Sequence, residues 1–316
     1  DVGLSWPLDA KQIAVIGNGN VALDVARMLV KLPDDLLETD IPDHVYKGLS
    51  ASPVTDVHVF GRRGPAQVKF SPLELREALH VNGVQSIVYE EDFQYDEGSE
   101  EAIASNNQVR VMVKTLEDLR QNPQEPQERR LHLHFFSSPV EILGEDGKVV
   151  GLKVERTKLD GTGNVTGTGE FLEYPVQAVY RAVGYFGSAV DQIPFDAATG
   201  VISNAAGRVI DEAGNPIPGV YCTGWIKRGP VGLIGHTKAD AIETIGHVIE
   251  DRSSWWQPTR PGENQILETL KDRNVEYIDW EKWLKIDSRE KALGESAGRE
   301  RIKLFDREEL LKISKG

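Results

Sequence analysis

A short apolar strand, a glycine turn and a helix constrain the fold of this chain more than any other segment. Gln12–Gly17 predict a buried strand, and Asn20–Lys31 predict a helix that is apolar around most of its circumference. Gly17 at the end of the strand, Gly19 in the turn and Ala22 in the first turn of the helix have the order G-x-G-x-x-A. This succession is typical of the first strand and helix of a parallel α/β sheet.

The glycine turn has the residues that a dinucleotide pyrophosphate needs. Gly17 allows a tight turn, Gly19 lets backbone N–H groups approach a phosphate, and Ala22 keeps the helix close to the sheet. The phosphates would then face the unpaired N–H groups and the positive end of the helix. An ordinary strand-helix turn is the alternative, but the flanking strand and helix favour dinucleotide binding. Gly161 and Gly163, by contrast, lie between two predicted strands and indicate a hairpin.

Two arginines stand where a dinucleotide site usually carries an acidic residue, after the second strand. We expect this strand at Thr55–Phe60, followed by Arg62 and Arg63. Guanidinium groups match a 2′-phosphate in charge and geometry, and one charge-assisted bond contributes roughly 1.5–3 kcal/mol. The pair therefore favours NADP(H) over NAD(H); two merely solvated arginines are the alternative.

A well-marked helix follows the arginines. Ser71 and Glu74 form an S-x-x-E pattern around Pro72, and Asn82 and Gly83 provide a left-handed exit. The pattern predicts a capping box, in which the carboxylate of Glu74 accepts a hydrogen bond from the Ser71 N–H. A functional role for Glu74 stays open beside this structural one.

The remaining patterns predict an interrupted α/β fold. Residues 32–53 are polar and proline-punctuated and predict an insertion with partial helix, whereas the acidic residues 90–101 predict a mobile surface loop. Between residues 131 and 182, alternating strands and glycine turns predict an inserted antiparallel meander. A second α/β portion follows, with strands near 208–211 and 219–223 and a helix at 237–251. The tail from residue 253 predicts two or three short helices.

A glycine-rich loop connects the last strand to the helix at 237–251. Trp225 stands at its start, and the glycines at 229, 232 and 235 would let the backbone approach a flat ligand. A plain connecting loop fits the composition equally well. Lys227 and Arg228 are interpreted either as surface charge or as contacts to a cofactor or acidic partner.

Charge and cysteine content exclude some functions. The chain has 50 acidic and 36 basic side chains, a net charge of −14, which argues against nucleic acid or an anionic membrane as a general partner. No apolar run approaches the ~20 residues of a membrane helix. The single cysteine, Cys222, predicts a buried structural thiol in a reducing, cytoplasmic setting. No metal ligands are assigned. The chain begins at Asp1 without a signal-peptide pattern, and we expect an N-terminal truncation.

A family resemblance joins these motifs. The chain carries, in this order, GNGNVALDVAR, GRRGP followed by LELRE, RAVGY and GWIKRGPVG. Together they resemble ferredoxin-NADP reductases of the adrenodoxin reductase type, which bind FAD and NADP. The resemblance places Glu74 in the NADP site and Arg62 and Arg63 on the 2′-phosphate. It implies pyrophosphate contacts from Asn18, Gly19, Asn20 and Val21, and FAD contacts from Trp225, Gly232, Leu233 and Ile234, with Gly232 also near NADP.

The resemblance also implies a domain organisation. Residues 1–188 would form the NADP(H)-binding domain, and 189–316 the C-terminal part of a discontinuous FAD-binding domain with a helical tail. Nothing before Gly17 supplies the N-terminal FAD fingerprint of the family. We therefore expect that FAD binding and turnover need a further N-terminal segment.

The resemblance implies hydride transfer from NADPH to FAD, followed by single-electron transfer to a ferredoxin-type iron–sulfur protein. The flavin supplies the chemistry, so we assign no protein residue as a catalyst. Two alternatives stay open. One is a reductase like the small subunit of glutamate synthase, although its cysteine-rich segment is not seen. The other is a non-catalytic NADP(H)-binding module or sensor.

Overall fold

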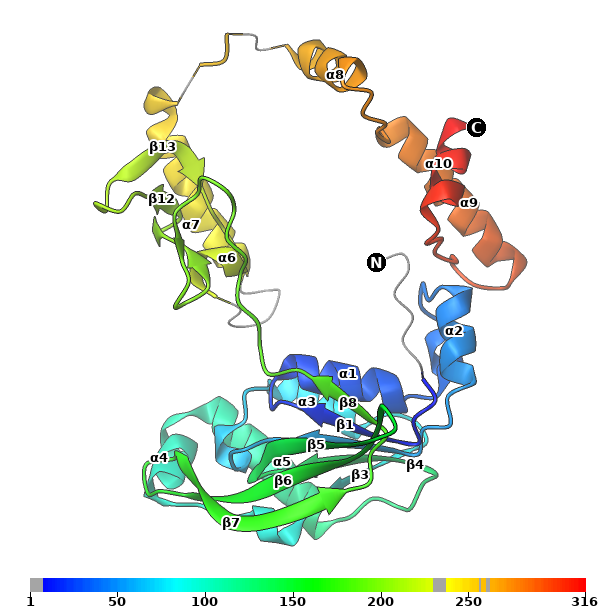
Figure 1. The fold of residues 1–316 in the computed structure, drawn as a ribbon, viewed down its shortest axis with the longest axis vertical. Helices are drawn as coiled ribbons and strands as arrows, with labels where there is room; N and C mark the ends of the chain where they lie inside the picture. The colour runs from blue at the N-terminus through cyan, green and yellow to red at the C-terminus, as the bar shows by residue number, and fades with distance from the viewer. Residues whose placement is uncertain (1–7, 230–236, 256, 260–261) are drawn as a thin grey trace. The chain divides into compact units, whose positions relative to one another are not determined.

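A computed structural model describes residues 8–229, 237–255, 257–259 and 262–316. The chain forms two compact units, which are described separately (Figure 1). The first consists of Asp1–Val183 and Ile278–Gly316, and the second of Gly184–Tyr277. The expected boundary at residue 188 separates the residues assigned to NADP(H) from those assigned to FAD. This assignment of cofactors stays a prediction.

A five-stranded parallel sheet organises the first unit. Its strands are neighbours in the order β3-β4-β2-β1-β8, and every pair is parallel. The strand expected at residues 12–17 is an inner strand of this sheet, and the parallel sheet with its helices confirms the predicted α/β class. The strands are β1 (Gln12–Ile16), β2 (Asp56–Phe60), β3 (Val84–Val88), β4 (Arg129–His134) and β8 (Ala178–Arg181).

Helices cover one face of the sheet. Side chains such as Val57 and Leu131 point from the strands into a buried cluster with Leu23, Leu75 and Leu116. Because side chains alternate along a strand, the intervening residues face the opposite side. The covering helices are α1 (Asn20–Val30), α3 (Pro72–Leu79) and α5 (Asn107–Gln121).

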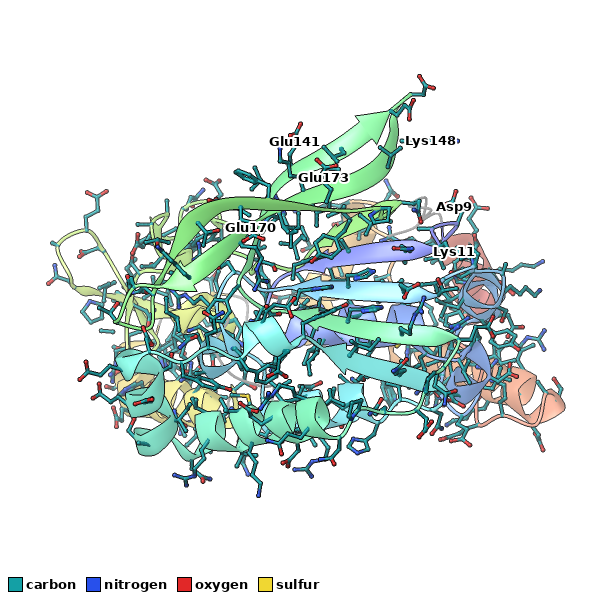
Figure 2. The ribbon with its side chains drawn as sticks, turned by 90° about the horizontal axis from the view of Figure 1, so that it is seen from below. Asp9, Lys11, Glu141, Lys148, Glu170 and Glu173 are labelled. Atoms are coloured by element: carbon teal, nitrogen blue, oxygen red, sulfur yellow. The ribbon has the colours of Figure 1, made fainter. Side chains whose placement is uncertain are left out.

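An antiparallel meander packs on the other face. Ala14 and Phe60 of the parallel sheet are buried there against Leu152 and Val154 of the meander. The meander exposes charged side chains such as Glu173 (Figure 2) and also apolar ones such as Phe171. The predicted meander is confirmed, although β4 and β8, within the range expected for it, belong to the parallel sheet. Its strands are β5 (Ser137–Glu145), β6 (Lys148–Leu159) and β7 (Val165–Tyr174).

The insertion and the end of the tail also belong to the first unit. The insertion contains η1 (Pro33–Leu36) and α2 (Asp43–Ser50), so the expected partial helix is confirmed. The tail contributes α9 (Trp280–Ser296) and α10 (Arg307–Lys315). Arg299, after α9, pairs with Asp43 at 3.1 Å and donates to the Ile41 carbonyl at 2.6 Å. The tail is therefore attached to the insertion.

The acidic segment at residues 90–101 is structured, so the predicted mobile loop is wrong. It forms η3 (Glu90–Asp92) and the start of α4 (Glu97–Ser105), whose first turn is capped by Asp96. Asp92 is only 1% exposed, accepts from the Phe135 N–H at 2.8 Å and pairs with Arg156 at 2.7 Å. Sequence composition missed this because Arg156 stands 64 positions later.

Replacing Asp92 by alanine should lower the free energy of unfolding by about 3–5 kcal/mol, because Arg156 and the Phe135 N–H would lose a buried partner. Urea unfolding at neutral pH measures the loss. Glu90→Ala is the matched control, since Glu90 is 77% exposed although it pairs with Arg120 at 2.5 Å. It should cost less than about 1 kcal/mol. Equal losses would contradict a structural role for the buried pair.

The second unit is built from small antiparallel sheets and helices. One sheet has the order β11-β12-β13, and a two-stranded ribbon pairs β10 with β9. The expected strands and helix are present at about the predicted positions. The elements are β9 (Phe195–Asp196), β10 (Val201–Ile202), β11 (Asn204–Ala205), β12 (Arg208–Ile210), β13 (Pro216–Tyr221), α6 (Trp225–Arg228), α7 (Thr237–Glu250), η5 (Asp251–Ser254) and α8 (Glu263–Asp272).

No helix among the described residues is both long and apolar enough to cross a bilayer.

Candidate dinucleotide site

Gly17 makes the tight turn at the end of β1. Its φ is 143°, and a Cβ atom there would overlap the carbonyl oxygen of Ala182, just beyond β8. The Gly17 N–H donates to the Phe60 carbonyl at 3.0 Å, which joins the turn to the end of β2. Any side chain at Gly17 would therefore be strained and would push apart the strand ends.

Gly19 leaves the start of α1 open. It is the N-cap residue, and neither a side-chain cap nor an acidic residue in the first turn compensates the positive end of the helix. A Cβ atom at Gly19 would meet only Lys69 Cβ, at 3.9 Å. Packing therefore does not require glycine at this position, whereas close approach of a phosphate to the backbone does.

The residues beside Gly19 differ in what they already bind. Asn20 Oδ1 accepts from the Ser71 N–H at 2.8 Å, and the Asn18 carbonyl accepts from the Lys69 N–H at 2.8 Å. Asn18 Nδ2 is buried and has no hydrogen-bond partner among the described residues. Val21 is exposed in the first turn of α1. The loop thus has an unused donor at Asn18, which suits a phosphate oxygen.

The meander fixes the backbone of the two arginines. Thr157 Oγ1 donates to the Arg62 carbonyl at 2.7 Å, and the Phe136 N–H donates to the Arg63 carbonyl at 3.2 Å. The Arg62 side chain is exposed, and Arg63 Nη2 donates to Asn164 Oδ1 at 3.3 Å. No local sequence pattern indicated these partners: Thr157 lies in β6, Asn164 in the hairpin turn after it, and Phe136 just before β5.

Only half of the predicted capping box forms. Ser71 Oγ accepts from the Glu74 N–H at 3.3 Å, but the Ser71 N–H is bound by Asn20, so the reciprocal bond to the Glu74 carboxylate is wrong. That carboxylate lies 3.7 Å from Arg27 of α1, beside Asp24. Burial and the charge of Asp24 raise the pKa of Glu74. Glu74 therefore stands in the contact between α1 and α3.

The expected flavin contacts are described only in part. Trp225 opens α6 after Gly224, whose φ is 74°, and the Trp225 and Tyr185 ring centroids are 5.5 Å apart. The indole is partly exposed, so a flat ring system can stack on it. The other three expected contacts, Gly232, Leu233 and Ile234, lie outside the described residues.

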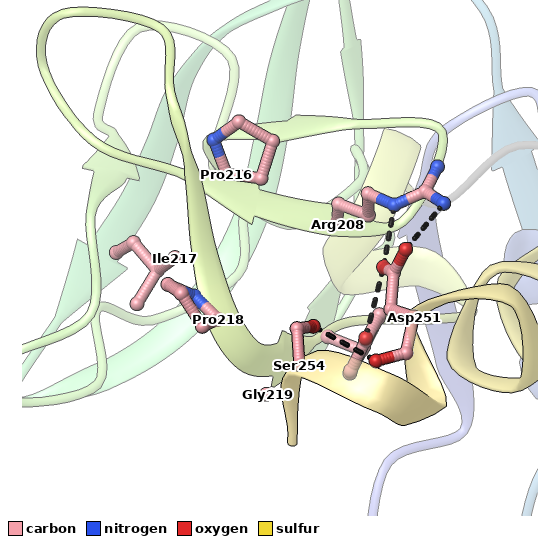
Figure 3. Close-up of a pocket in the computed structure, with 8 residues that line it drawn as sticks. Arg208, Pro216, Ile217, Pro218, Gly219, Asp251 and Ser254 are labelled. Atoms are coloured by element: carbon pink, nitrogen blue, oxygen red, sulfur yellow. Dashed lines mark hydrogen bonds and ion pairs between the residues drawn. The ribbon is translucent and has the colours of Figure 1, made fainter. Parts of the chain in front are cut away.

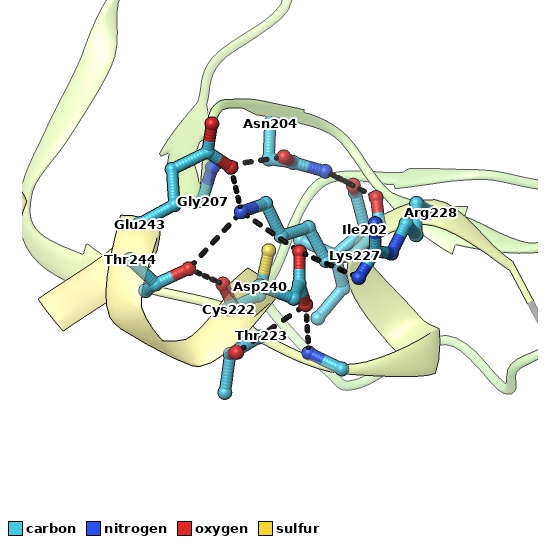
Figure 4. Close-up of polar contacts among 11 residues, drawn as sticks. Ile202, Asn204, Gly207, Cys222, Thr223, Lys227, Arg228, Asp240, Glu243 and Thr244 are labelled. Carbon is cyan, nitrogen blue, oxygen red and sulfur yellow. Dashed lines mark hydrogen bonds and ion pairs between the residues drawn. The ribbon is translucent and has the colours of Figure 1, made fainter. Parts of the chain in front are cut away.

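Lys227 belongs to a buried polar network within the second unit (Figure 4). Its Nζ lies 3.1 Å from Asp240 and 2.5 Å from Glu243. Asp240 also accepts from the Gly224 N–H at 2.6 Å, so the network fixes the turn before Trp225. Lys227 is therefore a structural residue rather than surface charge. Cys222 is buried beside it, as predicted, and burial raises the pKa of its thiol.

The charged side chains that line a pocket of the second unit already bind each other. Arg208 donates to both carboxylate oxygens of Asp251, at 2.7 and 2.9 Å (Figure 3). The remaining lining residues are Pro216, Ile217, Pro218, Gly219, Tyr221 and Ser254. We assign no ligand to this pocket.

Sequence reasoning missed a buried cluster of three histidines. His58 on β2 meets His132 and His134 on β4, on the face of the sheet that the meander covers. The alternating sequence His-Leu-His at residues 132–134 was a usable signal, because it places both imidazoles on one face of a strand. The partner on β2 was not recognisable without the strand register.

A glycine turn at an uncapped helix, with an arginine pair after the neighbouring parallel strand, is typical of dinucleotide-binding α/β proteins. The chain belongs to the family of NADPH-ferredoxin reductases that includes the NADPH:adrenodoxin oxidoreductases. The predicted family and fold are thereby confirmed. No protein-family model matches the chain.

The relatives match nearly all of this chain. It is 38% identical over 324 residues to NADPH-ferredoxin reductase FprA of Mycobacterium tuberculosis, covering 99% of this chain and 69% of the relative. It is 34% identical over 313 residues to the mitochondrial NADPH:adrenodoxin oxidoreductase of Arabidopsis thaliana, covering 94% and 65%. The solved structure of M. tuberculosis FprA in complex with NADPH has a TM-score of 0.86 at 37% identity, covering 98% and 69%. The chain thus spans about two thirds of the length of these relatives.

Proposed function

We propose that this chain supplies the NADP(H) site, and part of the FAD site, of a reductase that passes electrons from NADPH through FAD to a ferredoxin-type iron–sulfur protein. One observation carries the proposal. Since β1 and β2 are parallel neighbours, the open start of α1 and the arginine pair lie at the same edge of the sheet. A pyrophosphate and a 2′-phosphate are the two anionic groups of NADP(H), and this edge offers donors for both.

The described residues fit NADP(H). The glycine turn leaves room at Gly19 for a phosphate, and Asn18 Nδ2 offers a buried unused donor. Arg62 is exposed and Arg63 donates to the neutral amide of Asn164, and neither forms an ion pair with another described residue. Bound FAD would accept the hydride and release single electrons. The part of this chain is to bind and orient the nucleotide.

The exposed apolar face of α7 supports our proposal that the second unit is only part of a flavin-binding domain. Asp240 and Thr244 are buried on this helix, whereas Ile242, Ile245 and Ile249 are 55–65% exposed. A surface helix normally buries its apolar face and exposes its polar face, and α7 does the opposite within the second unit. Such an exposed apolar face indicates a surface that another protein segment covers. We propose that residues 189–316 are the C-terminal part of the FAD-binding domain and that a further flavin-domain segment covers this face. On the same basis we retain residues 1–188 as the NADP(H) domain.

The function is tested by comparing the chain alone with a completed protein. In the completed protein, the chain is fused to the part of M. tuberculosis FprA that lies outside the match, about a third of its length. The fusion should retain one FAD and reduce ferricyanide and a ferredoxin with NADPH, whereas the chain alone should bind NADPH but little FAD. NADPH binding without flavin in both proteins would favour the alternative, a non-catalytic sensor.

Replacing Ile245 by aspartate in the fusion should lower FAD retention and NADPH-dependent ferricyanide reduction by at least about tenfold, because burying a carboxylate against apolar surface costs several kcal/mol. Lys238→Asp, at another exposed position of α7, is the matched control and should have little effect. The flavin absorbance of the purified proteins measures retention. Full retention in Ile245→Asp would contradict a covered α7 face.

We also propose a cytoplasmic location, on the single buried thiol of Cys222. The comparisons are with ferredoxin and adrenodoxin reductases, which favours a ferredoxin-type acceptor over a glutamate synthase assembly. Reduction of a ferredoxin by the fusion is the measurement that separates these two acceptors.

A further inference from the structure

The three buried histidines converge from neighbouring parallel strands. His58 on β2 is the register partner of His132 on β4, and His134 follows two residues later on the same face. Tyr174 of the meander lies against them, with ring centroids 5.9 Å from His58 and 4.9 Å from His134. The imidazoles are therefore enclosed between the two sheets, where water has little access.

The distances suit ligands of one metal ion. One nitrogen of each imidazole lies within 4.8 Å of a nitrogen of the other two, and His58 Nδ1 is 3.0 Å from His134 Nε2. Two nitrogens bound to one tetrahedral zinc ion, each at about 2.0–2.1 Å, are separated by roughly 3.3 Å. The three rings are stacked with interplanar angles of 12–23°, so binding of one ion requires the imidazoles to rotate about their side-chain bonds.

The electrostatics favour neutral imidazoles, which are the metal-binding form. Burial, assisted by the neighbouring His132, lowers the pKa of His58 to about 3. Burial likewise lowers the pKa of His132, and it holds that of His134 well below its usual value.

An outer carboxylate is also in place. His132 Nε2 lies 2.9 Å from Asp56 Oδ1, and Arg130 donates to the same carboxylate at 2.6 and 2.9 Å. Burial opposes ionisation of Asp56, but hydrogen bonds from Arg130, Thr55 and His132 hold its pKa well below the usual range. An ionised carboxylate that accepts from a histidine N–H is the usual second partner of a ligating imidazole. Asp56 would orient His132 in this way, and His132 Nδ1 would bind the ion in place of the Tyr89 hydroxyl, which lies 2.8 Å from it.

We propose that His58, His132 and His134 bind one divalent transition-metal ion of the zinc class. Three imidazoles suit zinc or cobalt, whereas magnesium and calcium require oxygen ligands. The ion connects β2 to β4 beneath the meander and stabilises the first unit. The site is separate from the dinucleotide edge in its ligands, and it does not depend on the proposed reductase activity.

The test uses the full chain without an affinity tag, after removal of metal by a chelator. Zinc titrated against a chromophoric chelator should bind tightly at one equivalent per chain, and cobalt should give the intense visible absorption of a tetrahedral complex. His58→Gln and His134→Gln should each weaken zinc binding by at least about 10²-fold. The matched control, His80→Gln, changes an exposed imidazole and should bind as the parent chain does.

Far-UV circular dichroism and NADPH binding show whether the glutamine variants fold. If they do not fold, X-ray absorption at the zinc edge of the parent chain decides the question, with scattering from three imidazoles expected. No zinc retained by the parent chain, zinc bound without imidazole scattering, or folded glutamine variants that bind zinc normally would each overturn the proposal.

Discussion

Replacing Arg62 and Arg63 together by alanine should weaken NADPH binding by about 10²-fold or more, while NADH binding changes by less than about threefold. Each guanidinium would donate to the 2′-phosphate, and one such bond contributes roughly 1.5–3 kcal/mol. NADH has a hydroxyl group in place of this phosphate and would lose little. Dissociation constants for both nucleotides, measured by calorimetry at one ionic strength, test this difference.

The control for the arginine pair is Arg252→Ala with Arg273→Ala, which removes the same charge from two exposed positions of the second unit. It should leave the ratio of NADPH to NADH affinity unchanged. Equal losses of NADPH and NADH affinity in the Arg62 and Arg63 variant would remove the assignment of NADP(H).

Gly19→Ala should weaken NADPH and NADH alike, by about 10- to 100-fold, because a methyl group would separate the pyrophosphate from the backbone N–H groups. The loss of unfolding free energy should stay below about 1 kcal/mol, since the added Cβ atom meets only Lys69 and the φ of −124° suits alanine. Nucleotide titration and urea unfolding of the same preparation measure the two effects.

Gly17→Ala is the matched contrast to Gly19→Ala. The Cβ atom would overlap Ala182 and the φ of 143° is strained for alanine, so the free energy of unfolding should fall by about 2–4 kcal/mol. If Gly17→Ala were as stable as the parent chain, or if Gly19→Ala bound both nucleotides normally, the different roles of the two glycines would be wrong.

The features predictable from sequence are those that neighbouring residues determine. The turn at Gly17, the helix from Asn20 and the hairpins of the meander depend on local backbone geometry, and the structure has them at the expected places. The arginine pair was recognisable because it directly follows a strand whose apolar pattern is clear. Local patterns therefore predicted the edge of the sheet where the nucleotide is proposed to bind.

The features that sequence could not predict depend on contacts between distant residues. The Ser71 N–H binds Asn20, 51 positions earlier, so the local S-x-x-E pattern does not complete its capping box. Asp92 is ordered by Arg156 on the meander. The histidine cluster needs the register of β2 with β4, which joins residues more than 70 positions apart. Composition and periodicity contain no information on these pairings.

A crystal structure of the chain with bound NADP⁺ tests the central claim most directly. The account predicts that the 2′-phosphate lies within hydrogen-bond distance of the guanidinium groups of Arg62 and Arg63, and that the pyrophosphate contacts the backbone at Gly19 and the start of α1. A nucleotide bound elsewhere, or bound here with both arginine side chains directed into solvent, would contradict it.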